Sequence, residues 1–267
     1  MVKTVLSVAG SDCSGGAGIQ ADLKTIGALG LYGMSAVTAI TVQNTCGVYR
    51  TEPVPSGLVE EQMRAVFQDI RPDAVKIGMV GTSGNVRAIV SVLKEYRPAA
   101  VLDPVMVSTS GRELLDQEAS AILTEELFPL VTVITPNLPE AECLWGSCIS
   151  CETQREQAAE WMARKYQCSV LVKGGHAVGG ADDLLYDRQS GRTIWYRAER
   201  ADAENTHGTG CTLSSAIACG LARGKSLEDS VWEAKQYVAG AIRDGLDLGK
   251  GNGPLNHFYQ RRVQNIE

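Results

Sequence analysis

The segment TVLSVAGSDCSGGAGIQAD, residues 4–22, decides the fold. It opens with a β-branched apolar run from Thr4 to Ala9, passes through a glycine-rich loop, and enters a stretch with apolar residues at helical spacing that ends near Leu29. A buried strand, a glycine loop and an amphipathic helix in this order are typical of an α/β protein. This unit predicts a parallel sheet covered by helices.

The same alternation continues along the chain. Further strands are predicted at 35–42, 74–77, 100–102, 131–134 and 169–172, and helices at 56–70, 209–223 and 226–246. The segment 182–198 contains two alternating runs around Ser190-Gly191, which predict a β-hairpin. No linker, repeat or low-complexity segment divides the sequence. We expect one α/β domain over residues 1–267, with a mostly parallel central sheet and helices on both faces.

The composition argues against several classes of protein. The 267 residues include 25 Lys+Arg and 31 Asp+Glu, a net charge of −6, with 44% hydrophobic and 21% charged residues. These values argue against long disorder and against a surface that coats nucleic acid. The apolar runs are too short for a membrane span, and the N-terminus leads into a strand instead of a signal peptide. We therefore expect a cytoplasmic protein whose eight cysteines are mostly reduced thiols.

The first glycine loop only superficially fits a dinucleotide-binding fingerprint. Gly16-x-Gly18-x-x-Ala21 has the spacing, but several residues separate it from the preceding strand. The second strand ends in Gln43 and an asparagine, so it lacks the acidic residue that would bind a ribose. A Walker A loop is also absent, because no Gly-Lys-Ser/Thr follows. What remains is a backbone that a ligand can approach closely.

A second glycine loop, NTHGTGCT at residues 205–212, leads directly into a predicted helix. The first N–H groups of a helix have no partner within it, so Gly208, Thr209 and Gly210 are candidates for an anion site. A cysteine at this position is expected to have a lowered thiol pKa, which makes Cys211 the best candidate reactive residue. The alternative is a small core cysteine after an ordinary glycine turn.

Polar residues follow three further strands. Asn137 and Glu140 stand three apart at a helix start, where they could hold a hydrated Mg²⁺ or form an ordinary capping box. Asp103 and Lys173 follow two other strands, which adds a carboxylate and a cation at the same edge of the sheet. Two glycine loops with this set of side chains favour phosphoryl transfer, which needs positioning, charge neutralisation and a base.

Five blocks of sequence together resemble one known family. They are residues 14–25, 76–79, 135–141, 173–176 and 206–212, and they occur in order over nearly the whole chain. The family comprises the hydroxymethylpyrimidine/phosphomethylpyrimidine kinases of thiamine biosynthesis, in the ribokinase-like superfamily. The resemblance implies a three-layer α/β/α fold with a small β flap, and a homodimer. It also implies phosphorylation, with ATP and Mg²⁺, of 4-amino-5-hydroxymethyl-2-methylpyrimidine and then of its monophosphate.

The resemblance also implies roles for individual residues. Cys211 matches the family's proposed base, and Gly208, Thr209 and Gly210 match its anion hole. The ATP site is matched by Lys173, Thr206, Asn137 and Asp103, and the magnesium site by Glu140, Asn137 and Asp103. The pyrimidine pocket is matched by Gln43, Asp22, Met79, Gly10 and Ala17.

The chemistry of Gln43 agrees with this assignment. An aminopyrimidine edge offers an N–H donor beside a ring-nitrogen acceptor, and one carboxamide can meet both. The chain departs from the family at Asn256-His257, where a His-His pair is usual, so the resemblance assigns no role to His257. The cysteines at 143, 148, 151 and 168 include one CxxC but no second close pair, which argues against a zinc or iron–sulfur site.

Three alternatives remain open at this point. A pyridoxal kinase of the same superfamily would share the fold and the Gly-Thr-Gly-Cys loop, although Gln43 favours the pyrimidine. An acyl-transfer enzyme could use Cys211 with His207, but the sequence shows no third group to orient His207. A binding module that senses the pyrimidine would need Gln43 and Asp22 but not Cys211.

Overall fold

The computed structural model describes residues 2–105, 117–175, 181–198 and 207–260. All nine strands of this part of the chain form one sheet, with the order β3-β2-β1-β4-β5-β6-β7-β8-β9. The parallel strands are β1 (Thr4–Asp12), β2 (Tyr32–Asn44), β4 (Ala74–Ile77), β5 (Ala99–Leu102), β6 (Val133–Ile134) and β7 (Ser169–Val172). The antiparallel strands at the two edges are β3 (Gly47–Pro53), β8 (Asp183–Asp187) and β9 (Arg192–Tyr196).

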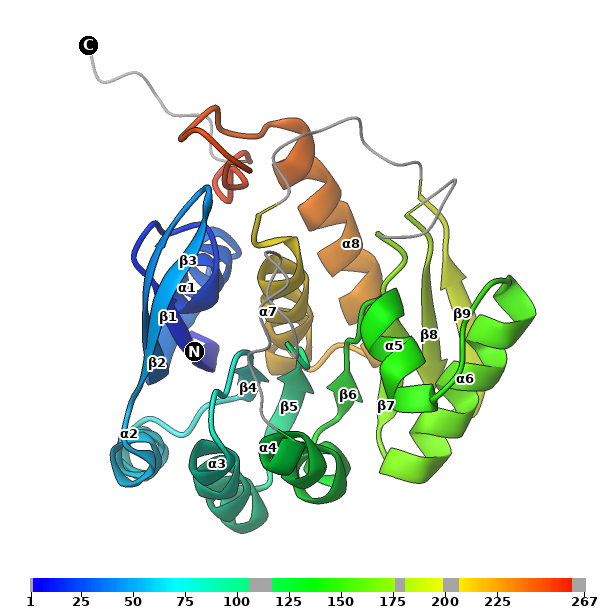
Figure 1. The fold of residues 1–267 in the computed structure, drawn as a ribbon, viewed down its shortest axis with the longest axis horizontal. Coiled ribbons are helices and arrows are strands. Elements are labelled where there is room, and N and C mark those ends of the chain that lie inside the picture. Colours follow the sequence, from blue (N-terminus) through cyan, green and yellow to red (C-terminus); the bar gives the residue numbers. More distant parts are fainter. Residues whose placement is uncertain (1, 106–116, 176–180, 199–206, 261–267) are drawn as a thin grey trace.

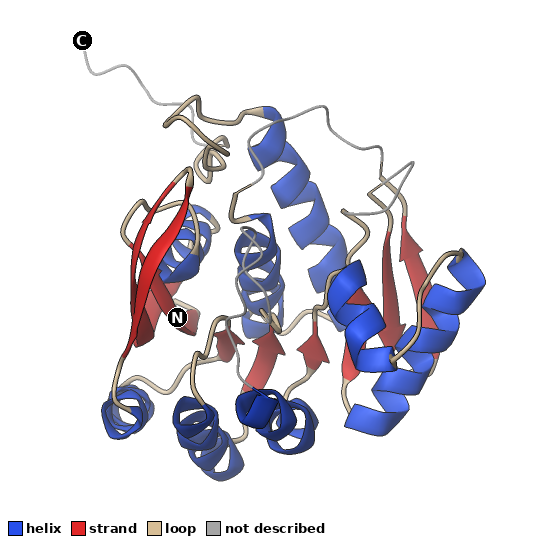
Figure 2. Ribbon diagram, in the orientation of Figure 1, coloured by secondary structure: helices blue, strands red, loops and turns tan. Residues whose placement is uncertain are grey.

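The helices lie on both faces of the sheet (Figures 1 and 2). One layer contains α1 (Gly18–Ala28), α7 (Thr209–Ala222) and α8 (Leu227–Arg243). The other contains α2 (Ser56–Asp69), α3 (Ser83–Tyr96), α4 (Gln117–Ile122), η1 (Leu123–Leu127), η2 (Phe128–Leu130), α5 (Leu138–Trp145) and α6 (Glu152–Tyr166). This is the predicted three-layer α/β/α architecture.

Helices cover both faces of the sheet, and successive side chains of a strand point to opposite faces, so the side chains on both faces are buried. In β5, Val101 packs into the core under α7 and α8, whereas Leu102 packs into the core under α2 to α6. Val133 and Ile134 of β6 divide in the same way. All four side chains have no exposed surface. Such short, wholly apolar strands are characteristic of a parallel sheet between two helical layers.

The structure extends the predicted strand at 35–42 and adds one that the sequence pattern did not reveal. β2 runs to Asn44 and turns into β3, and this hairpin forms one edge of the sheet (Figure 1). The hairpin is the small β flap of the predicted fold. The segment 182–198 forms the predicted hairpin, β8 and β9, at the other edge.

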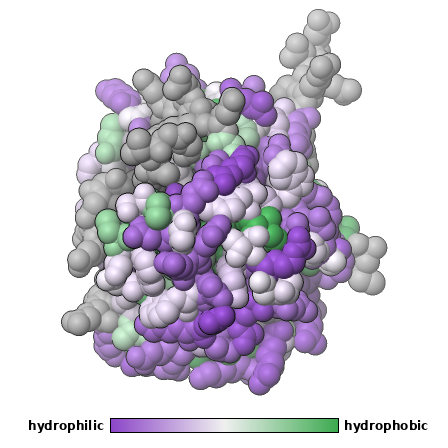
Figure 3. Space-filling view, turned by 90° about the vertical axis from the view of Figure 1, so that its right-hand side faces the viewer, coloured by the Kyte–Doolittle hydropathy of each residue, from purple (hydrophilic) through white to green (hydrophobic). Residues whose placement is uncertain are grey.

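The side of the molecule that bears β9 and α6 is mainly hydrophilic (Figure 3). Arg192, at the start of β9, forms an ion pair with Glu228, and Arg197, just after β9, forms pairs with Glu152 and Asp182. Charged residues along an edge strand oppose pairing with another sheet. Within the described residues, no helix has the length and apolar character of a membrane span.

Candidate active site

The carboxyl ends of the parallel strands bring distant residues of the predicted site together. Lys173, which follows β7, places its Nζ 2.6 Å from Oδ1 of Asp103, which follows β5. The Thr135 hydroxyl donates to the same carboxylate oxygen at 3.1 Å. A Cβ added to Gly210 would lie 3.0 Å from Asp103 Oδ2 and 3.3 Å from Lys173 Nζ. The ion pair therefore lies against the first turn of α7.

Burial disfavours the charged form of Lys173, but the carboxylates of Asp103 and Glu140 outweigh it and raise the pKa of the ammonium. The side chains of Lys173 and Asp103 are 15% and 4% exposed. Water screens so little exposed a charge only weakly, so the Lys173 ammonium would attract a phosphate beside it, while the Asp103 carboxylate would repel that phosphate. The structure thus positions a fixed cation next to the start of α7.

The loop before α7 is held in a shape that requires glycine. Gly208 has φ +86° and ψ 6°, in the left-handed region, and caps the helix that begins at Thr209. A Cβ at Gly208 would lie 2.0 Å from the carbonyl oxygen of Gly16, so the two glycine loops are in direct contact. The N–H groups of Thr209 and Gly210 belong to the first turn, where helices bind anions. The residues of the predicted anion site therefore lie at a helix start, and their binding of an anion stays a prediction.

The thiol of Cys211 differs from expectation. Burial raises its pKa, Lys76 and a hydrogen bond from the Gly18 backbone N–H lower it, and the carboxylates of Asp22 and Asp103 raise it again, with a net increase. The predicted lowering of the Cys211 pKa was therefore wrong. The reason is that burial and two nearby carboxylates outweigh the helix N-terminus and the lysine.

Asp22 lies beneath the site in a buried network. Its Oδ2 accepts from Lys76 Nζ at 2.8 Å and from Ser7 Oγ at 2.6 Å, and its Oδ1 accepts from Ser215 Oγ at 2.8 Å. Neither Asp22 nor Lys76 has exposed surface. Three side chains therefore hold Asp22 at the base of the site, and its role in the pyrimidine pocket stays a prediction.

Gly10 and Met79, two other predicted pocket residues, are in contact. A Cβ at Gly10 would lie 2.4 Å from Met79 Cε, so a side chain at residue 10 would require the end of Met79 to move. The backbone of Met79 is fixed by the Thr38 hydroxyl, which donates to its carbonyl at 2.6 Å. Ala17, in the same glycine loop as Gly16, remains partly exposed. These residues provide an apolar surface beside the first loop.

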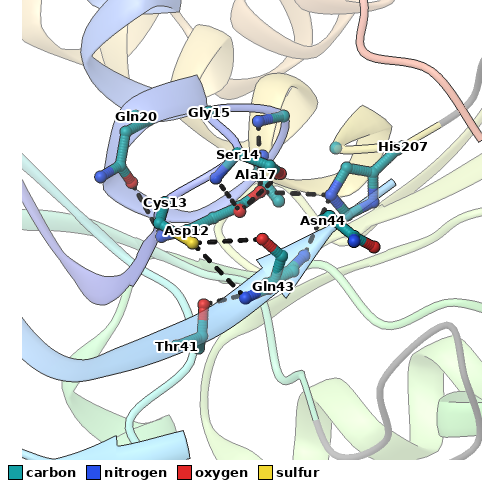
Figure 4. A network of polar contacts seen from close by, with 12 residues as sticks. Asp12, Cys13, Ser14, Gly15, Ala17, Gln20, Thr41, Gln43, Asn44 and His207 are labelled. Atoms are coloured by element: carbon teal, nitrogen blue, oxygen red, sulfur yellow. Dashed lines mark hydrogen bonds and ion pairs between the residues drawn. The ribbon is translucent and has the colours of Figure 1, made fainter. Parts of the chain in front are cut away.

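Gln43, at the end of β2, belongs to a polar cluster with Asp12 and His207 (Figure 4). The atom assigned as Gln43 Nε2 lies 3.2 Å from His207 Nε2, which in turn lies 3.3 Å from Asp12 Oδ2. Thr41 Oγ1 lies 3.1 Å from Gln43 Oε1. Asp12 is thus a group that could orient His207, which the acyl-transfer alternative required and the sequence did not show. The second contact of the His207 ring nitrogen is with Gln43.

Asn137 and Glu140 form the capping box that was one of the two predicted alternatives. Asn137 Oδ1 accepts from the Glu140 N–H at 2.9 Å, and Glu140 Oε2 accepts from the Asn137 N–H at 2.8 Å. Magnesium usually takes one or two carboxylates together with waters and phosphate oxygens. In the described part of the chain, no three His, Cys, Asp or Glu side chains form a metal site by themselves. Carboxylate oxygens such as those of Asp103 and Glu140 are of the kind that magnesium takes, and their role as magnesium ligands stays a prediction.

Three features of the sequence remain: Thr206, His257 and the cysteines. Thr206 lies outside the described residues. His257 is 3% exposed and its Nε2 lies 3.1 Å from Thr212 Oγ1, so it packs against the first turns of α7. All eight cysteines are free thiols, and of the four near 143–168 only Cys168 is buried.

Comparison with known proteins decides the family. The family model described as phosphomethylpyrimidine kinase matches residues 12–256. The chain belongs to this family. It is therefore a kinase, and the acyl-transfer and binding-module alternatives are excluded. The hydroxymethylpyrimidine/phosphomethylpyrimidine kinase of Rhizobium meliloti is 49% identical over 264 residues, which cover 97% of this chain and 98% of that protein.

Solved structures agree with membership of the phosphomethylpyrimidine kinase family. The phosphomethylpyrimidine kinase of Clostridium difficile is 44% identical, with a TM-score of 0.80, and the match covers 90% of this chain and 99% of that one. The pyridoxal kinase of Staphylococcus aureus, in complex with ADP, is 35% identical with a TM-score of 0.89, covering 98% and 96%. The fold alone therefore does not separate these two activities.

The sequence pattern predicts neither the contact between Asp12 and His207 nor the position of Lys76 beside Asp22. Asp12 and His207 lie 195 positions apart and meet only through the contact between the glycine loops. Lys76 lies within the short strand β4, and the strand pattern does not show that its side chain is buried against Asp22. An available signal was that a lysine in an otherwise apolar strand must find a carboxylate if it is buried.

Proposed function

We propose that this chain transfers the γ-phosphoryl group of ATP to the hydroxymethyl group of 4-amino-5-hydroxymethyl-2-methylpyrimidine, and then phosphorylates the resulting monophosphate. The observation that carries this proposal is the Gln43 amide, held by neighbouring side chains at the edge of the first glycine loop. Its donor and acceptor match the aminopyrimidine edge. Met79 and Ala17 would contact the apolar parts of the ring, with Gly10 behind Met79.

The phosphoryl end of the site would be the first turn of α7. Gly208, Thr209 and Gly210 would direct backbone N–H groups at the charge that develops on the transferred phosphoryl group. Lys173 would add a cation held by Asp103, and Thr206 would act on the nucleotide side, as the resemblance implies. The pyrimidine would bind beside the first glycine loop, and Gly16 of that loop contacts Gly208 of the second. The two substrates would therefore meet between the two loops.

Cys211 is the candidate base. As the hydroxymethyl oxygen attacks the γ-phosphorus, its proton would pass to the Cys211 thiolate while the bond to ADP breaks. Since burial raises the pKa of this thiol, the thiolate is a minor form at neutral pH. Phosphoryl transfer with a loose transition state requires little base assistance until late in the reaction, so a small thiolate fraction suffices.

ATP would enter with magnesium. Asp103 and Glu140 would hold the ion through carboxylate oxygens, with the side chain of Asn137 beside them. The ion would neutralise charge on the phosphates of ATP.

A pyridoxal kinase activity is the second candidate, favoured by the TM-score of 0.89 to the Staphylococcus aureus enzyme. Gln43 argues for the pyrimidine, because pyridoxal lacks the amino group beside a ring nitrogen that an amide would recognise. The test is incubation of the purified chain with ATP, Mg²⁺ and the hydroxymethylpyrimidine, followed by mass spectrometry. We expect a monophosphate that converts to a diphosphate. No phosphorylated pyrimidine would overturn the proposal.

We also propose that residues 1–267 act as one domain in a cytoplasmic homodimer. Ile40 and Val42, on the edge hairpin β2–β3, are 58% and 54% exposed, and an apolar edge of this kind fits a contact between subunits. Sedimentation of the wild type and of Val42→Lys tests the dimer. A dimer that Val42→Lys dissociates supports this surface, and a wild-type monomer contradicts it.

A further inference from the structure

We propose that His207 and Asp12 fix the orientation of the Gln43 amide and thereby determine which pyrimidine edge the pocket accepts. This inference rests on the proposed function, because it takes Gln43 as the residue that binds the ring. It assigns positioning roles to two residues 195 positions apart, neither of which the family resemblance placed in the pocket.

The carboxylate of Asp12 is the fixed point of the cluster (Figure 4). It accepts backbone N–H groups from Ser14 at 2.8 Å, Gly16 at 3.1 Å and Ala17 at 2.8 Å, so it is built into the glycine loop. Burial raises the pKa of Asp12, but the hydrogen bonds from His207, Ser14 and Ala17 outweigh it and lower the pKa to about 2. At neutral pH Asp12 is therefore ionised and can only accept hydrogen bonds.

This charge dictates the proton on His207. Its Nε2 faces Asp12 Oδ2 at 3.3 Å, and a lone pair directed at a carboxylate would be repelled. Nε2 must therefore carry hydrogen. The same Nε2 lies 3.2 Å from one terminal atom of the Gln43 amide. That atom must accept, so it is the carbonyl oxygen, because the nitrogen and oxygen of an amide are distinguished only by their partners.

The other end of the amide agrees with this orientation, in which the Asp12 carboxylate and the Gln43 oxygen share the single Nε2 hydrogen of His207. With the oxygen toward His207, the amide nitrogen faces Thr41 Oγ1, 3.1 Å away, and donates to it. The Thr41 hydroxyl then gives its one hydrogen to the Ser11 carbonyl at 3.0 Å. In the reverse orientation, the Gln43 nitrogen would face the His207 Nε2–H, so that two donors would meet with no acceptor between them, and the Thr41 hydrogen would be divided between Ser11 and Gln43.

A fixed amide discriminates between rings by their hydrogen-bonding edge. The 4-aminopyrimidine presents an N–H donor and a bare ring nitrogen. In the 4-oxo analogue, the carbonyl is an acceptor and the neighbouring ring nitrogen carries hydrogen, which reverses the pattern. An amide free to rotate could bind either compound by exchanging its oxygen and nitrogen. An amide locked by His207 rejects the 4-oxo compound because polar groups would be left unpaired.

The experiment compares His207→Gln with His207→Asn. Glutamine carries its terminal nitrogen near the position of Nε2 and preserves the donor, whereas the shorter asparagine does not reach it. The readout is the ratio of kcat/KM for the 4-amino compound to that for the 4-oxo compound. We expect the wild type to favour the 4-amino compound strongly, His207→Gln to keep the ratio, and His207→Asn to reduce it about tenfold, the effect of one hydrogen bond. The change should appear in KM more than in kcat.

Unchanged ratios in both variants, equal losses in both, or a wild type that uses both compounds alike would overturn the inference. Should His207→Asn fail to fold, Thr41→Val frees the other end of the amide, and the same fall in the ratio is expected. A wild type that does not phosphorylate the 4-amino compound at all contradicts the proposed function itself. The two failures are thereby distinguished.

Discussion

Lys173 Nζ lies 2.6 Å from Asp103 Oδ1, although the two residues stand 70 positions apart in the sequence. They follow β7 and β5, which flank β6 in the sheet, and they meet at the first turn of α7 beside Gly210. This pair links the sheet to the helix that we assign to phosphate binding. Its removal should affect stability and nucleotide binding together.

Lys173→Met should lower the free energy of unfolding by about 3 kcal/mol, because it leaves the Asp103 charge buried without its partner. It should also raise KM for ATP. The matched control is Lys3→Met, which removes an equally short pair, 2.6 Å to Asp73, on an exposed surface. The control should change stability by less than about 1 kcal/mol. Denaturant unfolding and ATP kinetics measure both, and equal effects in the two variants would contradict the assignment.

Cys211 should give the reaction an alkaline pH dependence. Because the pKa of its thiol is raised, the protonated form dominates at neutral pH, and kcat/KM should increase about tenfold per pH unit until the thiol ionises. Cys211→Ala should remove this slope and lower kcat. Cys219→Ala, a buried cysteine in the same helix, should lower stability but keep the slope. A flat profile for the wild-type protein would rule out Cys211 as the base.

Gly208→Ala should destabilise the protein by about 1–3 kcal/mol and abolish most activity, because its φ of +86° disfavours any side chain and the added Cβ would collide with the Gly16 carbonyl. Gly27→Ala is the control. It lies inside α1, where the added Cβ has no atom within 4 Å beyond its chain neighbours and the backbone of its own helix, and alanine there should stabilise by up to about 1 kcal/mol. Thermal unfolding distinguishes them, and similar melting temperatures for both variants would contradict the packing of the loops.

The sequence predicted these strand-end residues well, for a clear physical reason. Strands buried on both faces, such as β5 and β7, consist almost wholly of apolar residues, so the first polar residue after the apolar run shows where each strand ends. Asp103 and Lys173 are these first polar residues. β3 leaves no such run, since Arg50, Glu52 and Pro53 face solvent at an edge. Contacts between distant loops, as between His207 and Asp12, depend on packing that no local pattern records.

Two other outcomes show the limits of local patterns. The Asn137–Glu140 spacing suits both a capping box and a ligand pair, and the structure shows the capping bonds, while the magnesium role stays a prediction. The pKa of Cys211 was predicted from the helix N-terminus alone. The direction in which this pKa shifts depends on burial and on the Asp22 and Asp103 carboxylates, which come near Cys211 only in the folded structure.

His257 should make stability fall in weak acid. Burial and the nearby Lys24 charge lower its pKa to about 4, from 6.5 in the unfolded chain. Between these values the unfolded chain binds a proton that the folded one excludes, so the contribution is complete above pH 6.5 and is lost as pH falls toward 4, by up to about 3 kcal/mol. Unfolding at several pH values should show a shallower decline for His257→Asn. Identical declines would contradict the burial of a neutral histidine.

Gln43→Leu should raise KM for the pyrimidine by about tenfold or more, with a smaller effect on kcat, because the amide binds the ring in ground and transition states alike. Gln154→Leu, on α6 and bonded only to Ser150 among the described contacts, is the control and should not alter KM. Steady-state kinetics give both values. An unchanged KM in Gln43→Leu would remove this residue from the pocket.

The most direct test of the account is the rate of ADP release from ATP and Mg²⁺ with the hydroxymethylpyrimidine and, separately, with pyridoxal. The two families of solved structure are alike in fold, so only turnover separates their activities. We predict a kcat/KM for the hydroxymethylpyrimidine well above that for pyridoxal. ADP release with pyridoxal alone, or with neither compound, would contradict the account.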